Sequence, residues 1–128
     1  MLRQWMAAVC LGSCALLALS APAWAHVFPK TSQPRVGATV KTAPHNVKIW
    51  FDGGMEPVFS HLVVKDAAGK VVSKGQGKVT GTHQSLLETR LPAPLPNGVY
   101  EVYWSVIAHD GHHTQGHFAF TVKVSSRQ

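Results

Sequence analysis

The chain has 128 residues, which is enough for one domain and too few for two. Its formal net charge is +6, yet the lysines are scattered and no basic run is interleaved with aromatic residues. This distribution indicates a solvated surface and argues against a nucleic-acid partner. Both cysteines, Cys10 and Cys14, lie near the N-terminus. The rest of the chain therefore has neither a disulfide nor a thiolate cage for a soft metal.

Residues 1–25 have the pattern of a secretory signal peptide. Arg3 is the only charge before Ala25, and an apolar run from residue 5 to residue 19 leads to a small-residue end. The run is shorter than the ~20 residues that a membrane-spanning helix needs, so we expect no membrane insertion once it is removed. The triplet Ala23-Trp24-Ala25 predicts cleavage that leaves His26 as the first residue of a domain spanning 26–128, exported across a bacterial inner membrane into the periplasm.

Three other outcomes for this leader stay open. A cut after Ala23 satisfies the same small-residue rule. Residues 11–14 resemble a lipoprotein box, which would place a lipid on Cys14, although the apolar run continues beyond it. The leader could also remain as an uncleaved anchor.

The first predicted elements after the leader are short strands. Residues 47–51 alternate so that Val47, Ile49 and Phe51 share one face. Residues 60–73 read as a hairpin around a turn at 66–69 that ends on glycine. Residues 75–81 are rich in glycine and polar side chains and predict a loop.

The second half of the chain continues this pattern. Residues 85–91 predict a strand, residues 92–98 a rigid turn, and residues 99–107 the clearest strand. In the last strand, alternate residues from Phe118 to Val124 share a face. No stretch of ten residues has helical periodicity. Short strands separated by turns predict an all-β chain folded as an antiparallel β-sandwich.

The aromatic residues fit such a core. Trp104, Phe118 and Phe120 occupy inward positions of their strands and are expected to be buried there. Trp50 lies on the opposite face from Val47, where it either covers a second sheet or is exposed.

Histidines are the most informative residues of the chain. There are eight, and four fall within residues 109–117, between the two clearest strands. In extended backbone residues i and i+2 point the same way, so Asp110 and His112 are expected to face one site, with Gly111 giving room for a bend. By the same rule His109 and His113 point elsewhere. His45, His61 and His83 are interpreted as surface residues.

A carboxylate paired with an imidazole suits Cu(II), Zn(II) or Ni(II). Two side chains are too few for tight binding, but His26 as the first residue would add its α-amine and its ring Nδ1. The set of three nitrogens and one oxygen then favours tetragonal Cu(II). The simpler interpretation is a turn-capping Asp110 beside a surface His112.

Several short segments give the chain a resemblance to the CopC family of periplasmic copper-binding proteins. The resemblance spans the whole chain after the leader and is carried by Ala25-His26, Ser32-Gln33-Pro34, FDGGMEPVFS at 51–60, residues 66–70, residues 94–100, Tyr103-Trp104, Asp110-Gly111-His112, Gly116 and residues 118–122.

This resemblance implies a seven-stranded Greek-key β-sandwich of the immunoglobulin-like or cupredoxin-like kind. It also implies a Cu(II) site with His26, Asp110 and His112 as ligands. The expected role is that of a monomeric carrier or buffer without catalytic turnover, which works with an inner-membrane partner of the CopD type in copper resistance and homeostasis.

The chain departs from the family pattern in two places, and three further histidines have no counterpart in it. Met55 is the only methionine after the leader, so the methionine-rich Cu(I) site of some members is not expected. Asp52-Gly53 stands where many members have Ser-Glu. His109, His113 and His117 have no family role.

Two other functions compete with a copper carrier. A small copper monooxygenase would also use an N-terminal histidine chelate, but it normally needs a larger domain with a flat aromatic face. A β-sandwich adhesion module would bind no metal.

Overall fold

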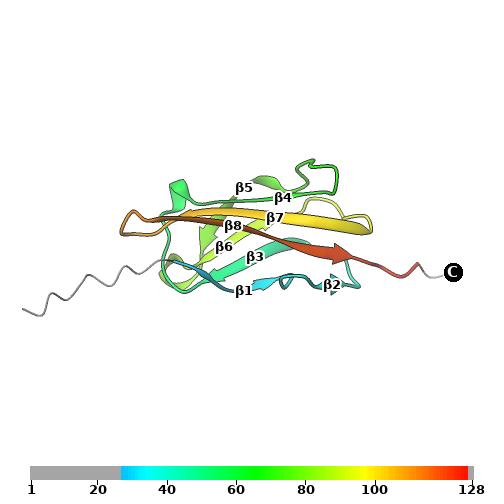
Figure 1. The fold of residues 1–128 in the computed structure, drawn as a ribbon, viewed down its shortest axis with the longest axis horizontal. Coiled ribbons are helices and arrows are strands. Elements are labelled where there is room, and N and C mark those ends of the chain that lie inside the picture. The colour runs from blue at the N-terminus through cyan, green and yellow to red at the C-terminus, as the bar shows by residue number, and fades with distance from the viewer. Residues whose placement is uncertain (1–26, 127–128) are drawn as a thin grey trace, which may run out of the picture.

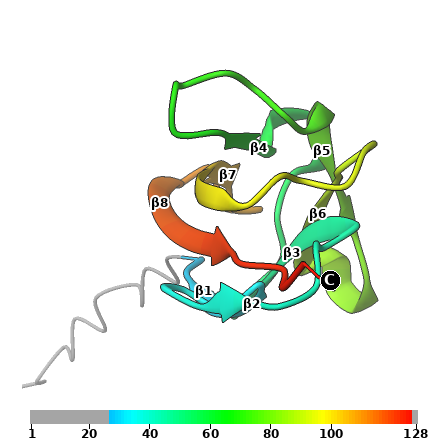
Figure 2. The same cartoon turned by 90° about the vertical axis from the view of Figure 1, so that its right-hand side faces the viewer.

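The structure, a computed structural model, describes residues 27–126 and is built of two four-stranded sheets packed face to face (Figures 1 and 2). The strand order is β1-β3-β6-β5 in one sheet and β2-β8-β7-β4 in the other. Two three-residue 3-10 turns, η1 at Pro57–Phe59 and η2 at Thr82–Gln84, are the helical segments of this part of the chain. Neither could cross a membrane.

The first sheet is antiparallel throughout. Its strands are β1 (Pro29–Gln33), β3 (Asn46–Phe51), β5 (Lys74–Thr80) and β6 (Leu86–Arg90). β1 and β5 are its two edges.

The second sheet combines one long hairpin with two shorter strands. Its members are β2 (Thr39–Val40), β4 (His61–Lys65), β7 (Gly98–Ile107) and β8 (His113–Val122). β7 and β8 pair over their full ten residues, whereas β2 adds to β8 in parallel at only two positions.

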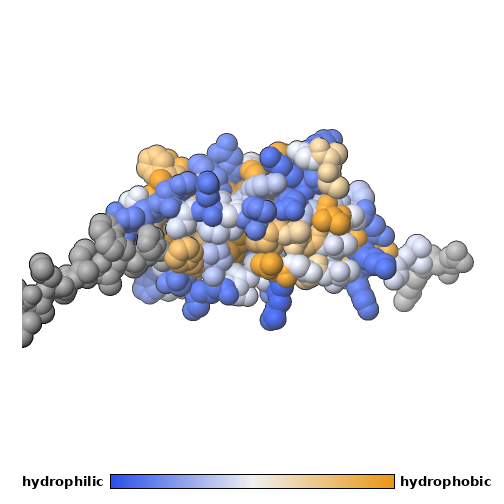
Figure 3. All heavy atoms as spheres, in the orientation of Figure 1, coloured by the Kyte–Doolittle hydropathy of each residue, from blue (hydrophilic) through white to orange (hydrophobic). Residues whose placement is uncertain are grey.

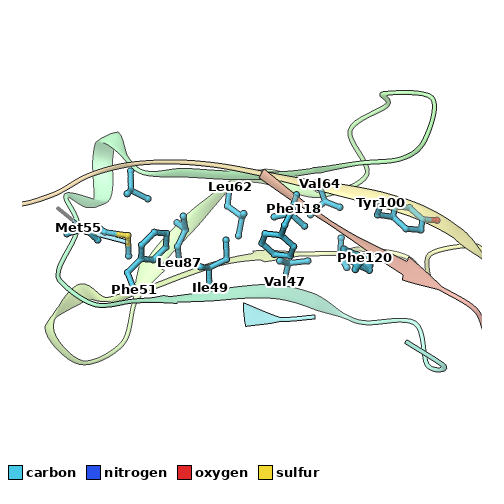
Figure 4. Close-up of a cluster of buried hydrophobic side chains, with 14 of the residues drawn as sticks. Val47, Ile49, Phe51, Met55, Leu62, Val64, Leu87, Tyr100, Phe118 and Phe120 are labelled. Atoms are coloured by element: carbon cyan, nitrogen blue, oxygen red, sulfur yellow. The ribbon is translucent and has the colours of Figure 1, made fainter. Parts of the chain in front are cut away.

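The core lies between the sheets and follows the predicted alternation (Figure 4). Inward residues are buried and their neighbours face outward, because successive side chains of a strand point to opposite faces. The central buried side chains are Val47, Ile49, Phe51, Leu62, Val64, Leu87, Tyr100, Val102, Val106, Phe118, Phe120 and Val122. Trp104 is partly buried and meets Phe51 edge-on, with ring centroids 5.4 Å apart.

The all-β sandwich is therefore confirmed, and so are the faces of residues 47–51 and 99–107. Residues 27–126 form eight strands where seven were expected, because the two-residue β2 adds one and pairs in parallel.

The predicted hairpin over residues 60–73 is only partly formed. Its turn is present, with the Asp66 amide donating to the Lys70 carbonyl at 2.9 Å. The returning limb makes a single bridge, Lys65 to Val71, in place of a strand.

The loop prediction for residues 75–81 is wrong, because most of this segment belongs to β5. The strand lacks the alternation of a half-buried strand since it is an edge with mostly polar, exposed side chains. Gly75 and Gly77 have positive φ, and the pairing register with β6 shifts between Lys74 and Lys78. Such a shift is typical of a bulged edge strand.

Candidate metal centre

The turn between β7 and β8 carries the predicted ligand pair. It is closed by two hydrogen bonds: the Ala108 amide donates to the His112 carbonyl, and the Gly111 amide donates to the Ala108 carbonyl, each at 2.9 Å. Gly111 has a φ of 89°, a left-handed conformation that glycine adopts at no steric cost. The turn thus depends on a residue without a side chain between Asp110 and His112.

Asp110 and His112 lie in contact within this turn. The His112 amide donates to Asp110 Oδ1 at 3.0 Å, and His112 Nδ1 lies 3.0 Å from the same oxygen. Asp side chains commonly hydrogen-bond the backbone two residues on, so the local sequence explains the geometry. The two residues come together as expected, but through a turn and not through extended backbone. The side chains of Asp110 and His112 are 42% and 32% exposed, although the Nδ1 atom of His112 is itself buried.

The beginning of the described chain is tied to the same end of the sandwich. Thr114, which lies two residues beyond His112, donates a hydrogen bond from its Oγ1 to the carbonyl of Val27 at 2.8 Å. Phe28 and Asp52 hold the segment further: the Phe28 amide donates to Asp52 Oδ1 at 2.8 Å, and the Asp52 amide donates to the Phe28 carbonyl at 2.9 Å. Figure 1 shows this segment and the β7–β8 turn at one end of the molecule.

His26, the third predicted ligand, lies outside the described residues. Within residues 27–126 no three histidine, cysteine or acidic side chains gather closely enough to hold a metal ion. The described part of the chain thus contributes a pair of donors.

The other three histidines of the cluster have partners of their own. His109 Nδ1 lies 2.8 Å from Glu56 Oε1, and His113 Nε2 lies 2.6 Å from Ser105 Oγ. His117 Nδ1 lies 3.3 Å from an oxygen of Glu101, and its ring stacks on a tyrosine. Each of these three side chains thus has a contact outside the Asp110–His112 pair. The exposed positions of His45, His61 and His83 agree with their interpretation as surface residues.

The backbone of Met55 lies beside the turn, but its side chain does not. Its backbone forms a bridge with Ala108, whereas its side chain is fully buried in the core (Figure 4). The thioether therefore faces away from any solvent-borne ion.

Sequence reasoning missed the residues that support this end of the molecule. Each of three such residues forms a hydrogen bond with a partner that is distant in the sequence: Asp52, Glu56 and Thr114. A local sequence pattern therefore could not predict them. The only signal was that Asp52 departs from the family pattern.

Together, the fold and this turn define a small β-sandwich that presents an imidazole and a carboxylate at one end. Residues 29–123 match the CopC domain, so the chain belongs to the CopC domain family, a class of copper-resistance and copper-transport proteins.

Known proteins similar to the chain agree with this membership. Protein YobA of Escherichia coli (strain K12) is 32% identical over 100 residues, which cover 78% of this chain and 81% of that protein. The copper transport protein CutJ of Bacillus subtilis (strain 168) is 26% identical over 107 residues, or 84% of this chain, but they cover only 20% of CutJ.

Solved structures share the fold. The crystal structure of CopC from Methylosinus trichosporium OB3b has a TM-score of 0.73 at 31% identity and covers 80% of this chain and 99% of that one. PcoC, a methionine-rich copper resistance protein from Escherichia coli, has a TM-score of 0.68 at 27% identity. The match covers 77% of this chain and 100% of the PcoC chain. This chain is not methionine-rich, since it has three methionines in all.

Proposed function

We propose that the exported protein begins at His26 and binds one Cu(II) through the α-amine and ring of His26 together with Asp110 and His112. The observation that carries this proposal is the hydrogen bond from Thr114 to the Val27 carbonyl. Val27, the first described residue, is thereby held against β8 two residues after His112. That proximity supports a site shared by the chain's start and the turn.

The chemistry of the donors fits Cu(II). Imidazole, amine and carboxylate are borderline to hard ligands, and residues 27–126 offer neither a thiolate nor an accessible thioether. Asp110 Oδ1 accepts the His112 amide in the turn, and its carboxylate is the oxygen donor of the proposed set. The partial exposure of both side chains suits a cargo ion that must be released again.

The protein then serves as a periplasmic copper carrier or buffer without catalytic turnover. Membership of the CopC family supports this role, as do the names of a copper resistance protein and a copper transport protein among the relatives. Delivery to an inner-membrane partner of the CopD type is part of the proposal. A copper monooxygenase would instead release peroxide from oxygen when a reductant is added, and the carrier should not.

Alanine substitutions test the ligand set. His26→Ala, Asp110→Ala and His112→Ala should each weaken Cu(II) binding at least tenfold, because each removes a donor. His113→Ala is the matched control, since this neighbouring imidazole lies against Ser105. Competition with a Cu(II) chelator gives the affinities, and circular dichroism first checks that the variants fold. Wild-type affinity in His112→Ala with a loss in His113→Ala would overturn the assignment.

A further inference from the structure

A groove of about 570 Å³ lies between the edges of the two sheets, where β1 faces β8. Trp104 provides apolar surface above the buried Ile49 and Phe118, and Lys30 and Arg35 lie on the β1 side. We propose that this groove docks an extended, acidic peptide segment of a partner protein, which adds as a strand to the free edge of β8. The proposal is independent of the copper site.

The backbone of β8 is available for such a strand. The Thr121 amide donates to the Ala38 carbonyl at 2.8 Å, and the Lys123 amide donates to the Val40 carbonyl at 2.9 Å. The backbone groups of Thr121 and Lys123 therefore point away from β7. Because the hydrogen-bonding direction alternates along a strand, Gln115 and His117 face the same way. Within the described chain, neither of these two residues has a backbone partner on that side.

The free edge has defined ends. Thr114 binds the Val27 carbonyl at one end, and the Gly37 amide donates to the Ala119 carbonyl at the other, at 2.7 Å. The open stretch between them has room for a short strand of a few residues. Main-chain hydrogen bonds would supply affinity, and the groove would take alternate side chains, as in other cases of strand addition.

The charge of the groove selects the occupant. Lys30 and Arg35 are exposed, and none of the described residues that line the groove carries a carboxylate. Glu101 lies against the lining residue His117 but is not itself part of the lining. An acidic segment complements this surface, whereas a basic segment would be repelled.

Trp104 forms part of the groove surface because Gly116 has no side chain. A Cβ at Gly116 would lie 2.6 Å from the indole. The ring therefore lies directly over the β8 backbone, where it can contact an apolar side chain of the added strand. Figure 3 shows hydrophobic and hydrophilic side chains next to each other on the face that carries β8 and β1.

A labelled eight-residue peptide that alternates glutamate with valine is the probe. It should bind the exported protein, and its amide shift changes should be centred on Gln115 and His117. The double variant Lys30→Glu with Arg35→Glu should weaken binding at least tenfold. The matched control is Lys74→Glu with Lys78→Glu, on the opposite edge of the same sheet, and it should bind nearly as well as wild type.

Two further peptides make the test specific for strand addition. N-methylation of alternate backbone amides should abolish binding, and replacing glutamate by lysine should do the same. Equal binding of the N-methylated peptide, or of inorganic polyphosphate with the same shift changes, would show general attraction of anions and overturn the proposal. So would a larger loss in the Lys74–Lys78 variant than in the Lys30–Arg35 variant.

Discussion

Met55 is a core residue whose sulfur is not accessible to the proposed metal site. Its side chain is fully buried between the sheets, although its backbone pairs with Ala108 at the start of the turn. Cu(I) prefers soft sulfur ligands, so the burial of Met55 leaves residues 27–126 without an accessible sulfur donor for Cu(I). The residue therefore contributes to packing and not to metal choice.

Met55→Leu tests this assignment. The exchange nearly conserves volume, so the free energy of unfolding should fall by less than about 1.5 kcal/mol. Cu(I) binding should be weak in both proteins and unchanged by the substitution, measured by competition with a Cu(I) chelator. A tight Cu(I) complex that is lost in the variant would contradict the burial argument.

Gly116 has a specific steric role opposite Trp104. Because a Cβ would overlap the indole at 2.6–3.1 Å, Gly116→Ala must displace the ring or the strand. Overpacking of this kind costs about 1–3 kcal/mol of unfolding free energy, measurable by urea denaturation. Gly69→Ala is not a suitable control, because Gly69 has a positive φ that alanine rarely adopts. Ala119→Gly is the control, because it changes a residue of the same strand, β8, without introducing a steric clash. An unchanged stability in Gly116→Ala would show that the indole moves freely.

Part of the candidate site was predictable residue by residue. Asp110 and His112 are two positions apart, so any turn or strand brings them near each other. The supporting contacts were not predictable, because Thr114–Val27 and Phe28–Asp52 join segments 87 and 24 residues apart in the sequence. Only the folded sandwich decides which backbone groups these side chains meet.

Among the elements, the strands with one buried face were predictable and the polar edge was not. β3, β7 and β8 alternate because one face of each packs on the core. β5 has no fully buried residue, so hydrophobic periodicity carries no signal for it. Its pairing with β6 is what makes it a strand. Glycine-rich composition favours a loop and gives no sign of an available strand partner.

Tyr100 stabilises the segment before β7 through a hydrogen bond and through packing. Its hydroxyl donates to the Pro96 carbonyl at 2.6 Å, while its ring stacks in the core on Phe120. Tyr100→Phe should lower the free energy of unfolding by about 0.5–1.5 kcal/mol at neutral pH, because it removes one hydrogen bond and keeps the packing. Thermal or urea denaturation measures this loss.

The same residue gives the protein a sensitivity to alkaline pH. Burial raises the pKa of Tyr100 above its ordinary value near 10, and the charge of Asp66 raises it further. The folded state thus holds this proton more tightly than the unfolded chain. Its contribution to stability is complete below about pH 10 and is lost as the pH rises through the folded-state pKa. Tyr100→Phe should remove this part of the alkaline loss, and an identical pH profile in both proteins would contradict the assignment.

At the scale of the whole molecule, one end of the sandwich joins three distant parts of the chain. The start of the described chain lies on β8, the β7–β8 turn carries Asp110 and His112, and Glu56 near η1 contacts the turn through His109. A metal held by the first residue and by the turn would cross-link the two ends of a long closed segment. Metal binding should therefore stabilise the fold as a whole.

Cu(II) should raise the free energy of unfolding of the protein that begins at His26. At a free concentration of 100 times Kd, binding to the folded state alone adds about 2.7 kcal/mol, or roughly 10 °C in Tm for a domain of this size. A chain that retains Ala25 keeps the imidazole but lacks the α-amine of His26, so its shift should be much smaller. The shift should also shrink as the pH falls below about 6, because protons compete for the nitrogen ligands. N-terminal sequencing of the exported protein belongs to the same experiment. Trp24 or Cys14 as the first residue, or equal shifts with and without Ala25, would remove the amine from the proposed site.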